Sequence, residues 1–316
     1  MLPFPIEDLM DEQACYEFLK EVLHPDGLHC PKGHRLPAEQ APHDRTRTPI
    51  VSYRCRECGR VFNIFTNTVL SNISFSSCEI VLLLRGIVQG DPTTHIAQEL
   101  DRDYSNLLTW RHRLQKQGLA NRMAVQLADE AVEVDEVYQN SGHKGPGDDD
   151  DDDQMPPRQR ANKRRGRGTM DTDRPPVVGI IGRESNQMRV EVCVDARQET
   201  VLPLVKETTA PDATVHTDEA HTYRPLAETG RDHHTVSHGD REWARDDDGD
   251  GVNEVHTNTI EGSWKQWRNF MRPFRGLHQK YLSQYAVVFE WIHNLKAVTM
   301  DCLRSLLIPN FTTEPI

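Results

Sequence analysis

Apolar residues between about 71 and 125 recur every three to four positions, which is the spacing of helices that bury one face. The spacing predicts three helices, over residues 77–90, 91–101 and 103–118. Gly90 should end the first of them, because glycine is favoured just past the end of a helix. Three helices joined by short turns are therefore expected in this part of the chain.

After residue 126 the apolar pattern changes to alternation within brief β-branched runs, which is typical of strands. The pattern predicts a strand over "AVEVDEVYQ", a hairpin turned at "GRESNQ", a helix over "ETVLPLVKET" and a strand that ends at Asp218. An order of strand, hairpin, helix and strand is consistent with a mixed sheet of the ribonuclease H type.

The first of these strands carries three carboxylates, those of Glu133, Asp135 and Glu136. Alternation places Asp135 on one face with Glu133 and Val137. A carboxylate on a central strand has to be paired, protonated or bound to a metal ion. On an edge strand Asp135 would instead be solvated, and solvation is also open to Glu133 and Glu136.

Residues 140–176 interrupt the pattern with a polar segment that has almost no apolar side chains. Such a segment cannot offset its ordering entropy by burial, so a disordered insert is expected. Six aspartates at 148–153 are followed by six basic residues between Arg158 and Arg167. The two charge runs could be solvated, pair with each other or grip phosphates.

Composition and charge narrow the class of protein. The 316 residues include 37 basic and 49 acidic side chains, a net charge of −12. The excess is largely aspartate, which resembles the surfaces of proteins from extreme halophiles, so net charge here bears on solubility rather than on partners. No apolar run reaches the roughly 18 residues that cross a bilayer. We therefore expect a soluble, cytoplasmic, nucleoid-associated protein without a membrane partner.

Cysteine and histidine are concentrated in residues 1–70. Seven cysteines, two of them in the CxxC of "YRCRECG", favour metal ligation over a disulfide framework. In the first knuckle, "HCPKGH", Gly33 stands where a second cysteine would be usual. The predicted zinc ligands are Cys30, His34, Cys55 and Cys58. His29 and His43 are alternatives for the histidine, and a buried pair of free cysteines is the alternative to the whole zinc ribbon.

The helix predicted over 103–118 alternates leucines with cations. The DNA-contacting residues expected on it are Arg111, Arg113 and Lys116. A short helix, a tight turn and a basic helix form a helix-turn-helix pattern, whose last helix could enter a major groove. A three-helix bundle with a solvated basic face would give the same pattern.

Asp218 ends the strand in "TVHTDEAHTY", where side chains face the crevice at the carboxyl end of a sheet. Glu219 competes with it, but Glu219 is expected to begin the following turn. A second carboxylate at the end of a strand favours a functional role for Asp135 as well.

A further helix is expected in "HTNTIEGSWKQWRNFMRPFRG", ending at or before Pro273. Asn258 could cap this helix, and Glu261 would then be the third residue of a capping box. Alternatively, Glu261 begins a helix face that carries Glu261, Lys265, Arg268 and Arg272. A carboxylate at one end of a line of cations suits a metal ion there and a phosphate backbone along the rest.

The stretch "DDDGDGVNEVHT" begins like a calcium loop, with Asp246, Asp248 and Asp250 at its first, third and fifth positions. The twelfth position requires a bidentate glutamate but is Thr257. Calcium is therefore not expected here.

Three motifs, "VEVDEVY", "HTDEAHTY" and "NTIEGSWKQWRNFMRPFRG", behind a ribbon that ends "YRCRECGRVFNIFTNTVL", resemble the insertion-sequence transposases with an ISXO-type catalytic domain. The resemblance covers nearly the whole chain. It implies a ribonuclease H-like fold with Asp135, Asp218 and Glu261 as the acidic triad, and Asn258 as a rival for the third position. The chain departs from the pattern at Gly33 in the first knuckle and in the long insert.

The resemblance further implies phosphoryl transfer with two divalent cations, Mg²⁺ or Mn²⁺, held by the triad. Asp135 would bridge the two cations, and Lys265 and Arg268 would hold the scissile strand. The activity implied is cleavage of double-stranded DNA at insertion-sequence ends and joining to target DNA, by a homodimer or a larger synaptic complex. The alternatives are a DNA-binding regulator with an inactive nuclease-like domain and a structure-specific nuclease.

The expected fold class is multidomain, α+β and α/β. A zinc ribbon would occupy residues 1–70, a helix-turn-helix 71–125, and a ribonuclease H-like catalytic domain 126–316, with the insert inside the last.

Overall fold

The computed structural model describes residues 4–122, 126–142, 165–247, 249–274, 276–295 and 299–310. Internal contacts divide the chain into two compact units, unit 1 with Met1–Met123 and Leu295–Ile316, and unit 2 with Ala124–Asn294. Within the described ranges, no helix combines the length and the apolar run that crossing a bilayer requires.

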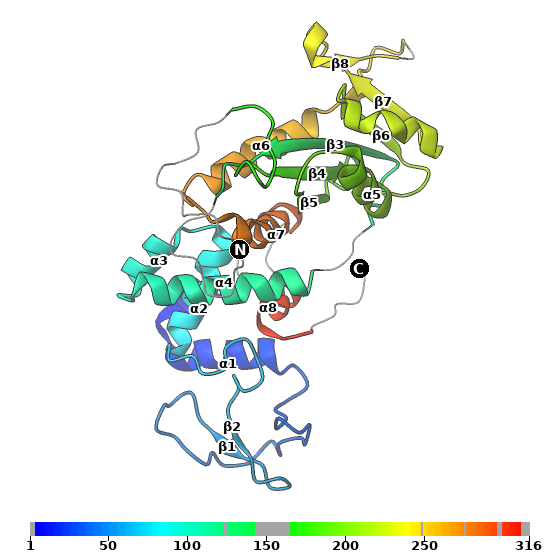
Figure 1. The fold of residues 1–316 in the computed structure, drawn as a ribbon. Coiled ribbons are helices and arrows are strands. Elements are labelled where there is room, and N and C mark those ends of the chain that lie inside the picture. The colour runs from blue at the N-terminus through cyan, green and yellow to red at the C-terminus, as the bar shows by residue number, and fades with distance from the viewer. Residues whose placement is uncertain are drawn as a thin grey trace. The chain divides into compact units, whose positions relative to one another are not determined.

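The regular elements of unit 1 are mainly helices, with two short strands in the long irregular segment between α1 and α2 (Figure 1). Its elements are η1 (Ile6–Met10), α1 (Glu12–Leu23), β1 (Tyr53–Arg54), β2 (Val61–Phe62), α2 (Ser77–Gln89), α3 (Thr93–Glu99), α4 (Tyr104–Ala120) and α8 (Met300–Leu307). The three helices predicted between 77 and 118 are confirmed as α2, α3 and α4. Helix α2 begins with a reciprocal capping box between Ser76 and Glu79 and ends with Gly90 as its cap.

The C-terminal helix α8 belongs to unit 1, where it packs against α1 and α4. Leu303, Leu306 and Leu307 are fully buried there. The side chain of Asn121, at the end of α4, donates a 2.7 Å hydrogen bond to the carbonyl of Ser305. These contacts join α8 to the N-terminal helices, although residues 126–316 were expected to form one domain; the three-domain division itself stays a prediction.

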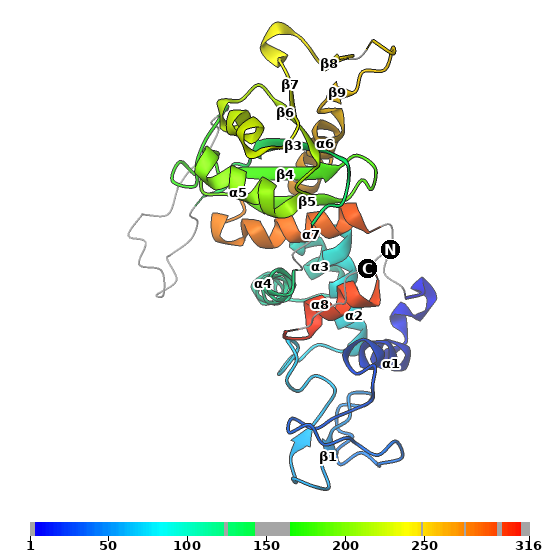
Figure 2. The same cartoon turned by 90° about the vertical axis from the view of Figure 1, so that its right-hand side faces the viewer.

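Unit 2 contains a sheet with helices on both faces (Figure 2). Its elements are β3 (Ala131–Tyr138), β4 (Pro176–Gly182), β5 (Met188–Val192), α5 (Gln198–Thr208), β6 (Thr214–Asp218), η2 (His221–Thr229), β7 (His233–Val236), η3 (His238–Asp240), β8 (Ala244–Arg245), β9 (Val255–His256), α6 (Asn258–Met271), η4 (Gln279–Tyr281) and α7 (Leu282–Asn294). The predicted hairpin is β4 and β5, the predicted helix is α5, and α6 ends before Pro273 as expected.

The five strands of the main sheet lie in the order β5-β4-β3-β6-β7. Strand β3 is antiparallel to β4 and parallel to β6. This mixed sheet fits a ribonuclease H-like domain. Because β3 has a neighbour on each side, the alternative of Asp135 on an edge strand is wrong.

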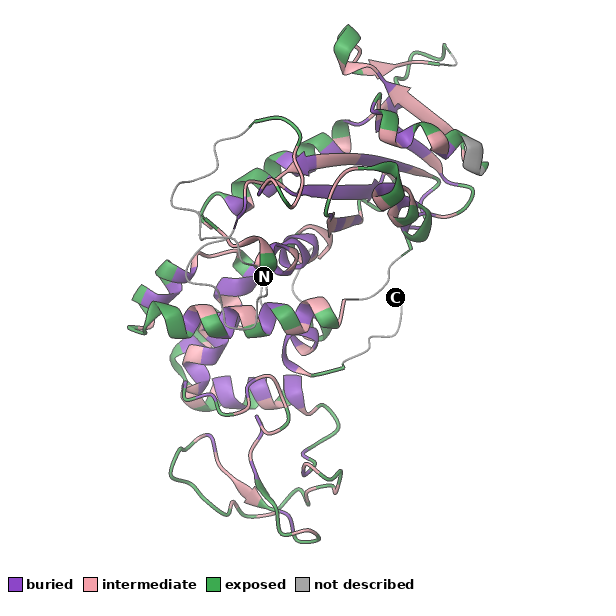
Figure 3. Cartoon of the chain, in the orientation of Figure 1, coloured by how far each residue is buried: buried purple, intermediate pink, exposed green. Residues whose placement is uncertain are grey.

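Alternation along the central strands divides the core into two layers, and most of β3 and β4 is buried (Figure 3). Val137, Val177 and Ile181 pack on α6 and α7, with Trp264 and Trp267 from α6. On the other face, the cluster of buried residues includes Val132, Val134, Val178, Ile180, Val201, Val205 and Tyr223. Glu133, Asp135 and Val137 therefore face α6, as the alternation predicts.

Most of the expected insert, residues 143–164, lies outside the described residues. Its described ends are held in place, so the expected bounds 140–176 are too wide. The Arg174 side chain donates to the Gly166 carbonyl at 2.6 Å and to the Asn140 side chain at 2.7 Å. The amide of Met170 donates to the Val194 carbonyl at 2.8 Å, and β4 already begins at Pro176.

Candidate active site

Two of the three predicted acidic residues lie side by side on neighbouring strands. Strands β3 and β6 run parallel with Glu133 opposite His216. Two residues further along both strands, the same register brings Asp135 level with Asp218. In-register residues of parallel strands point to the same face, so both carboxylates face the layer of α6.

Asp135 is held against α6 by a hydrogen bond that its Oδ2 accepts from the Trp264 indole nitrogen at 2.9 Å. Gly179, opposite Asp135 on β4, makes room for this contact. A Cβ atom there would lie only 2.7 Å from Trp264 and 2.8 Å from Ile260. The absence of a side chain at position 179 therefore allows α6 to lie close to the sheet.

The environment of Asp135 disfavours its charge. Burial, followed by the negative charge of Glu136, raises the pKa of Asp135 to about 7, and the charge of Asp218 acts in the same direction. A carboxylate at the centre of a sheet with a second one beside it has the electrostatic character of a site that receives a cation.

Asp218 is the last residue of β6, where its Oδ1 accepts the amide hydrogen of Ala220 at 3.0 Å. Glu219 is exposed and turns toward the segment after β7, where it accepts from the Ser237 hydroxyl and, at 3.3 Å, from the amide of Gly239. Asp218 rather than Glu219 thus shares the register of Asp135.

Glu261 lies in the first turn of α6, with its side chain 42% exposed. Its Oε1 is 3.0 Å from Nε2 of His238, just after β7, and 3.3 Å from the Thr257 hydroxyl, which donates to it. Since β7 pairs with β6, His238 connects Glu261 to the edge where Asp218 lies. Among the described residues, Glu261 does not share a 4.8 Å cluster of metal-ligating atoms with Asp135 and Asp218.

The capping alternative for Glu261 is not what the structure shows. The N-cap of α6 is Thr257, without a side-chain cap, and Asn258 is the exposed first residue of the helix. The amide of Ile260 instead donates to the carboxylate of Glu133 on β3, at 2.9 Å. Glu133 is fully buried, so the suggestion that it is solvated is wrong.

Glu136 faces the opposite side of the sheet. Its carboxylate accepts hydrogen bonds from the hydroxyls of Tyr223 at 2.7 Å and Tyr138 at 3.2 Å. Burial raises the pKa of Glu136, and the nearby charge of Asp218 adds to the effect. The sequence offered no sign of the Tyr223 contact, because Tyr223 is 87 positions along the chain from Glu136.

The cations predicted on α6 lie on its outer side. Lys265, Arg268 and Arg272 are all exposed, and with Glu261 they follow one helical face. On the adjoining side of the helix, about a quarter turn away, Trp264 and Trp267 are buried in the core. The face therefore has the arrangement that the sequence predicts.

In unit 1 the predicted zinc ligands come together. The ligand atoms of Cys30, His34, Cys55 and Cys58 all lie within 4.8 Å of one another. His34 Nδ1 is 3.4 Å from the sulfur of Cys30 and 3.5 Å from that of Cys55. The backbone amide of Cys58 lowers the pKa of the Cys55 thiol, which favours the thiolate that a metal ion needs. These residues could hold zinc.

The structure separates His34 from its two rivals. His29 Nδ1 contacts the Gly27 carbonyl at 2.9 Å, and His43 Nε2 accepts from Arg54 at 3.2 Å. The other ring nitrogen of His34 faces Glu57 at 3.5 Å, an outer partner that would orient the ring. Gly33, with φ of +85°, allows the tight turn that brings His34 back to Cys30.

The basic residues predicted on α4 do not share one face. Arg113 and Lys116 are exposed, and the Arg113 guanidinium lies 4.5 Å from the Trp110 ring centre. Arg111 is 1% exposed and donates to the carbonyl of Asp91. Arg111 is therefore a core residue that joins α4 to the turn before α3, and the helix-turn-helix itself stays a prediction.

Two other features do not coincide with the predicted site. Ligand atoms of Asp246, Asp250 and Glu254 lie within 4.8 Å of one another, but amides of the same loop donate to all three carboxylates.

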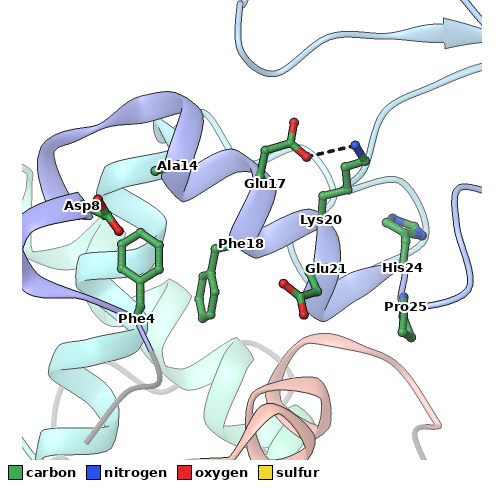
Figure 4. A pocket seen from close by; sticks show the side chains of 9 residues that line it. All are labelled: Phe4, Asp8, Ala14, Glu17, Phe18, Lys20, Glu21, His24 and Pro25. Atoms are coloured by element: carbon green, nitrogen blue, oxygen red, sulfur yellow. Dashed lines mark hydrogen bonds and ion pairs between the residues drawn. The ribbon is translucent and has the colours of Figure 1, made fainter. Parts of the chain in front are cut away.

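In unit 1, a hollow of about 450 Å³ lies beside α1, between the rings of Phe4 and Phe18 and the Glu17–Lys20 ion pair (Figure 4). No predicted site residue lines it.

Comparison with known proteins gives three findings. The family model of the ISXO2-like transposase domain matches residues 126–294. A curated protein of Halobacterium salinarum, described as an uncharacterized protein in transposable element ISH50, is 26% identical over 288 residues, 90% of this chain and 92% of that protein. A chain from the simian T-cell lymphotropic virus intasome in complex with PP2A regulatory subunit B56 gamma aligns over 69% of this chain and 70% of its own, with 9% identity. Its TM-score of 0.31 is too low to establish a shared fold.

Proposed function

The chain belongs to the family of ISXO2-like transposases, and from that membership we propose that it cleaves double-stranded DNA at the ends of an insertion sequence and joins them to target DNA. The observation that most supports this chemistry is the parallel pairing of β3 with β6 up to Glu133 and His216, because Asp135 and Asp218 each follow two residues later and the charge of Asp218 acts on Asp135.

The donor set fits divalent cations. Asp135, Asp218 and Glu261 offer hard carboxylate oxygens, which select Mg²⁺ or Mn²⁺ over softer metals. Burial and the nearby negative charges of Glu136 and Asp218 raise the pKa of Asp135, and a bound cation would offset the negative charge gathered there. When bound, two such ions would lower the pKa of water or of a DNA 3′ hydroxyl and would stabilise the leaving 3′ oxygen.

The chain's own residues would orient the ligands and the DNA. Trp264 fixes one carboxylate oxygen of Asp135 by its hydrogen bond. His238 would hold Glu261 at the carboxyl edge of the sheet. Lys265, Arg268 and Arg272 would contact the phosphates of the scissile strand from the exposed face of α6.

Unit 1 would bind the ends of the element. Zinc held by Cys30, His34, Cys55 and Cys58 would fold the ribbon, and Arg113 and Lys116 would contact the DNA backbone from α4. Because transposition requires two DNA ends to be held together, a homodimer or a larger synaptic complex is part of the proposal.

The test uses full-length protein, Mg²⁺, a plasmid target and duplexes that carry the inverted repeats flanking the gene. Wild-type protein should cleave the duplex ends and join them to the plasmid. Asp135→Asn and Asp218→Asn should each lower both steps by about a hundredfold or more. Each change removes a negative charge that would hold the cations beside the reacting phosphoryl group. The matched control is Asp212→Asn, at an exposed aspartate two residues before β6 begins, and it should leave both steps unchanged.

Other outcomes identify the rival functions. Cleavage without joining would indicate a structure-specific nuclease. Binding of the ends without cleavage, in both Mg²⁺ and Mn²⁺, would indicate a regulator with an inactive nuclease-like domain. Full activity of Asp135→Asn would show that the acidic site has been assigned to the wrong residue.

A further inference from the structure

Glu133 is a buried carboxylate with four partners and no part in the chemistry proposed above. Its side chain is 0% exposed. Its Oε1 lies 3.0 Å from Arg183 Nε, 3.1 Å from His256 Nδ1 and 3.0 Å from the Thr259 hydroxyl. Its Oε2 accepts the amide hydrogen of Ile260 at 2.9 Å. Burying an ion is costly unless its partners compensate it, and here each oxygen has at least one donor.

The partners come from segments that are distant in sequence but meet at the start of α6. Arg183 follows β4, and its guanidinium also donates to the carbonyls of Glu254 and His256, which lead into α6. The first amides of a helix have no partner within the helix and carry a partial positive charge. The N-cap residue of α6 provides no side-chain acceptor. Glu133, on the neighbouring strand β3, provides the acceptor instead.

Glu133 and Asp135 attach α6 to β3 at two points with matching spacing. Glu133 accepts from Ile260, and Asp135 accepts from Trp264, four residues later in the helix. Two residues of a strand advance by about 6.7 Å, and four residues of a helix advance by about 6 Å. Both bonds can form together only in one register of α6 along β3. Glu261, which follows Ile260 directly, takes its position from that register.

We propose that Glu133 is a positioning residue: it fixes the N-terminus of α6 on β3 and thereby sets where Glu261 stands relative to Asp135 and Asp218. The inference rests on the proposed function of these three carboxylates. Glu133 is placed outside the contacts with DNA and metal, because its side chain is 0% exposed and its carboxylate lies among the guanidinium, the imidazole, the hydroxyl and the amide.

The variant that tests this role is Glu133→Asp. It keeps the negative charge that offsets Arg183 but shortens the side chain by one methylene, so the carboxylate withdraws from the Ile260 amide. The matched control is Glu290→Asp. Glu290 is also buried, accepts the Val190 amide at 2.8 Å and lies 3.7 Å from Arg189, but it joins α7 to β5 and does not contact α6 through these bonds.

In the full-length protein, Glu133→Asp should lower kcat for end cleavage by about a hundredfold, the cost expected for a misplacement of about 1 Å. The KM for the DNA ends should stay unchanged, and the Mg²⁺ concentration for half-maximal cleavage should rise several-fold. Mn²⁺ binding without DNA, measured by electron paramagnetic resonance, should weaken to the level of Glu261→Gln. Glu290→Asp should leave kcat, KM, the Mg²⁺ requirement and Mn²⁺ binding unchanged, even where it lowers the melting temperature as much as Glu133→Asp does.

Equal losses in Glu133→Asp and Glu290→Asp, in proportion to their melting temperatures, would reduce Glu133 to a structural ion pair and overturn the inference. If Glu133→Asp unfolds, Glu133→Gln takes its place. Because Gln can still accept from Ile260, it should retain cleavage and Mn²⁺ binding, and a folded Glu133→Gln that loses as much of both as Glu261→Gln would overturn the inference. If wild-type protein neither cleaves ends nor binds Mn²⁺, the proposed function has failed, and the role of Glu133 fails with it.

Discussion

The role of Glu261 depends on which partners its carboxylate meets. In the sequence, both capping and metal binding are compatible with its spacing from Asn258. In the structure, the capping acceptor for α6 is Glu133, and Glu261 contacts His238 and Thr257 on the exposed side. Replacing Glu261 therefore removes a charge at the edge of the sheet without removing a helix cap.

We predict that Glu261→Gln lowers cleavage of DNA ends by about a hundredfold, with end binding retained and the melting temperature nearly unchanged. The stability effect is small because the ion pair with His238 is partly exposed. The matched control is Glu199→Gln, an exposed first-turn glutamate of α5 on the other face of the sheet. Asn258→Ala should be close to silent, since Asn258 is exposed and does not cap α6.

Cleavage rates and thermal melts of the same preparations check this prediction. Should Glu261→Gln cleave normally while Asn258→Ala is folded but inactive, then Asn258 is the third active-site ligand and Glu261 is not.

Among the local elements, the two knuckles of unit 1 bring their ligands together within short stretches of chain. The turn after Cys30 closes with the Gly33 amide on the Cys30 carbonyl at 2.7 Å, and the turn after Cys55 closes with Gly59 at 2.9 Å. Cys30, Cys55 and Phe62 form only a small buried cluster of their own. A metal ion would therefore be the main source of stability for this element.

The zinc prediction follows from that small core. Full-length protein purified without added metal should contain about one zinc ion per chain, and Cys55→Ser should lose most of it. Cys193→Ser, a buried thiol in the sheet of unit 2, should keep the wild-type zinc content. Plasma emission analysis measures the metal, and full zinc in Cys55→Ser would remove this cysteine from the site.

At the scale of the whole molecule, the last described helix of the chain packs in unit 1 with the N-terminal helices. Helix α8 lies in unit 1, while the segment that precedes it in sequence, α7, packs on β5 in unit 2. The amide of Val69 donates to the Leu307 carbonyl at 3.1 Å, and Arg304 donates to the Val22 carbonyl at 3.2 Å. The stability of unit 1, for which DNA binding is proposed, should therefore depend on α8.

Leu306→Ala tests this dependence. Leu306 is fully buried, so truncation should cost about 2–5 kcal/mol, and it should weaken the binding of DNA ends together with zinc retention. Ile292→Ala, at a 39% exposed isoleucine of α7, is the control and should cost well under that amount. Denaturant titration with zinc release as the readout measures both. A Leu306→Ala protein that unfolds only in unit 2 would contradict the assignment of α8.

Local patterns predicted much of this fold, because they depend on neighbours along the chain. Alternation identified the face that Asp135 shares with Val137, and helical spacing identified α2, α3 and α4. Ligand spacing identified the Cys30 and Cys55 knuckles, although it left open which histidine completes them. The exposure of Arg111 was misjudged: it lies among the cations of a basic helix, yet it is buried.

The sequence by itself therefore determined the elements, the faces of the central strand and the candidate carboxylates, since periodicity and chelate spacing are encoded over a few residues. Only the tertiary structure decided which charges are compensated and by what. Glu133 meets Ile260 across 127 positions of the chain, and the side chain of Asn121 meets Ser305 across 184. The fate of a charge depends on the donors that folding brings around it, and no local spacing records partners so far apart.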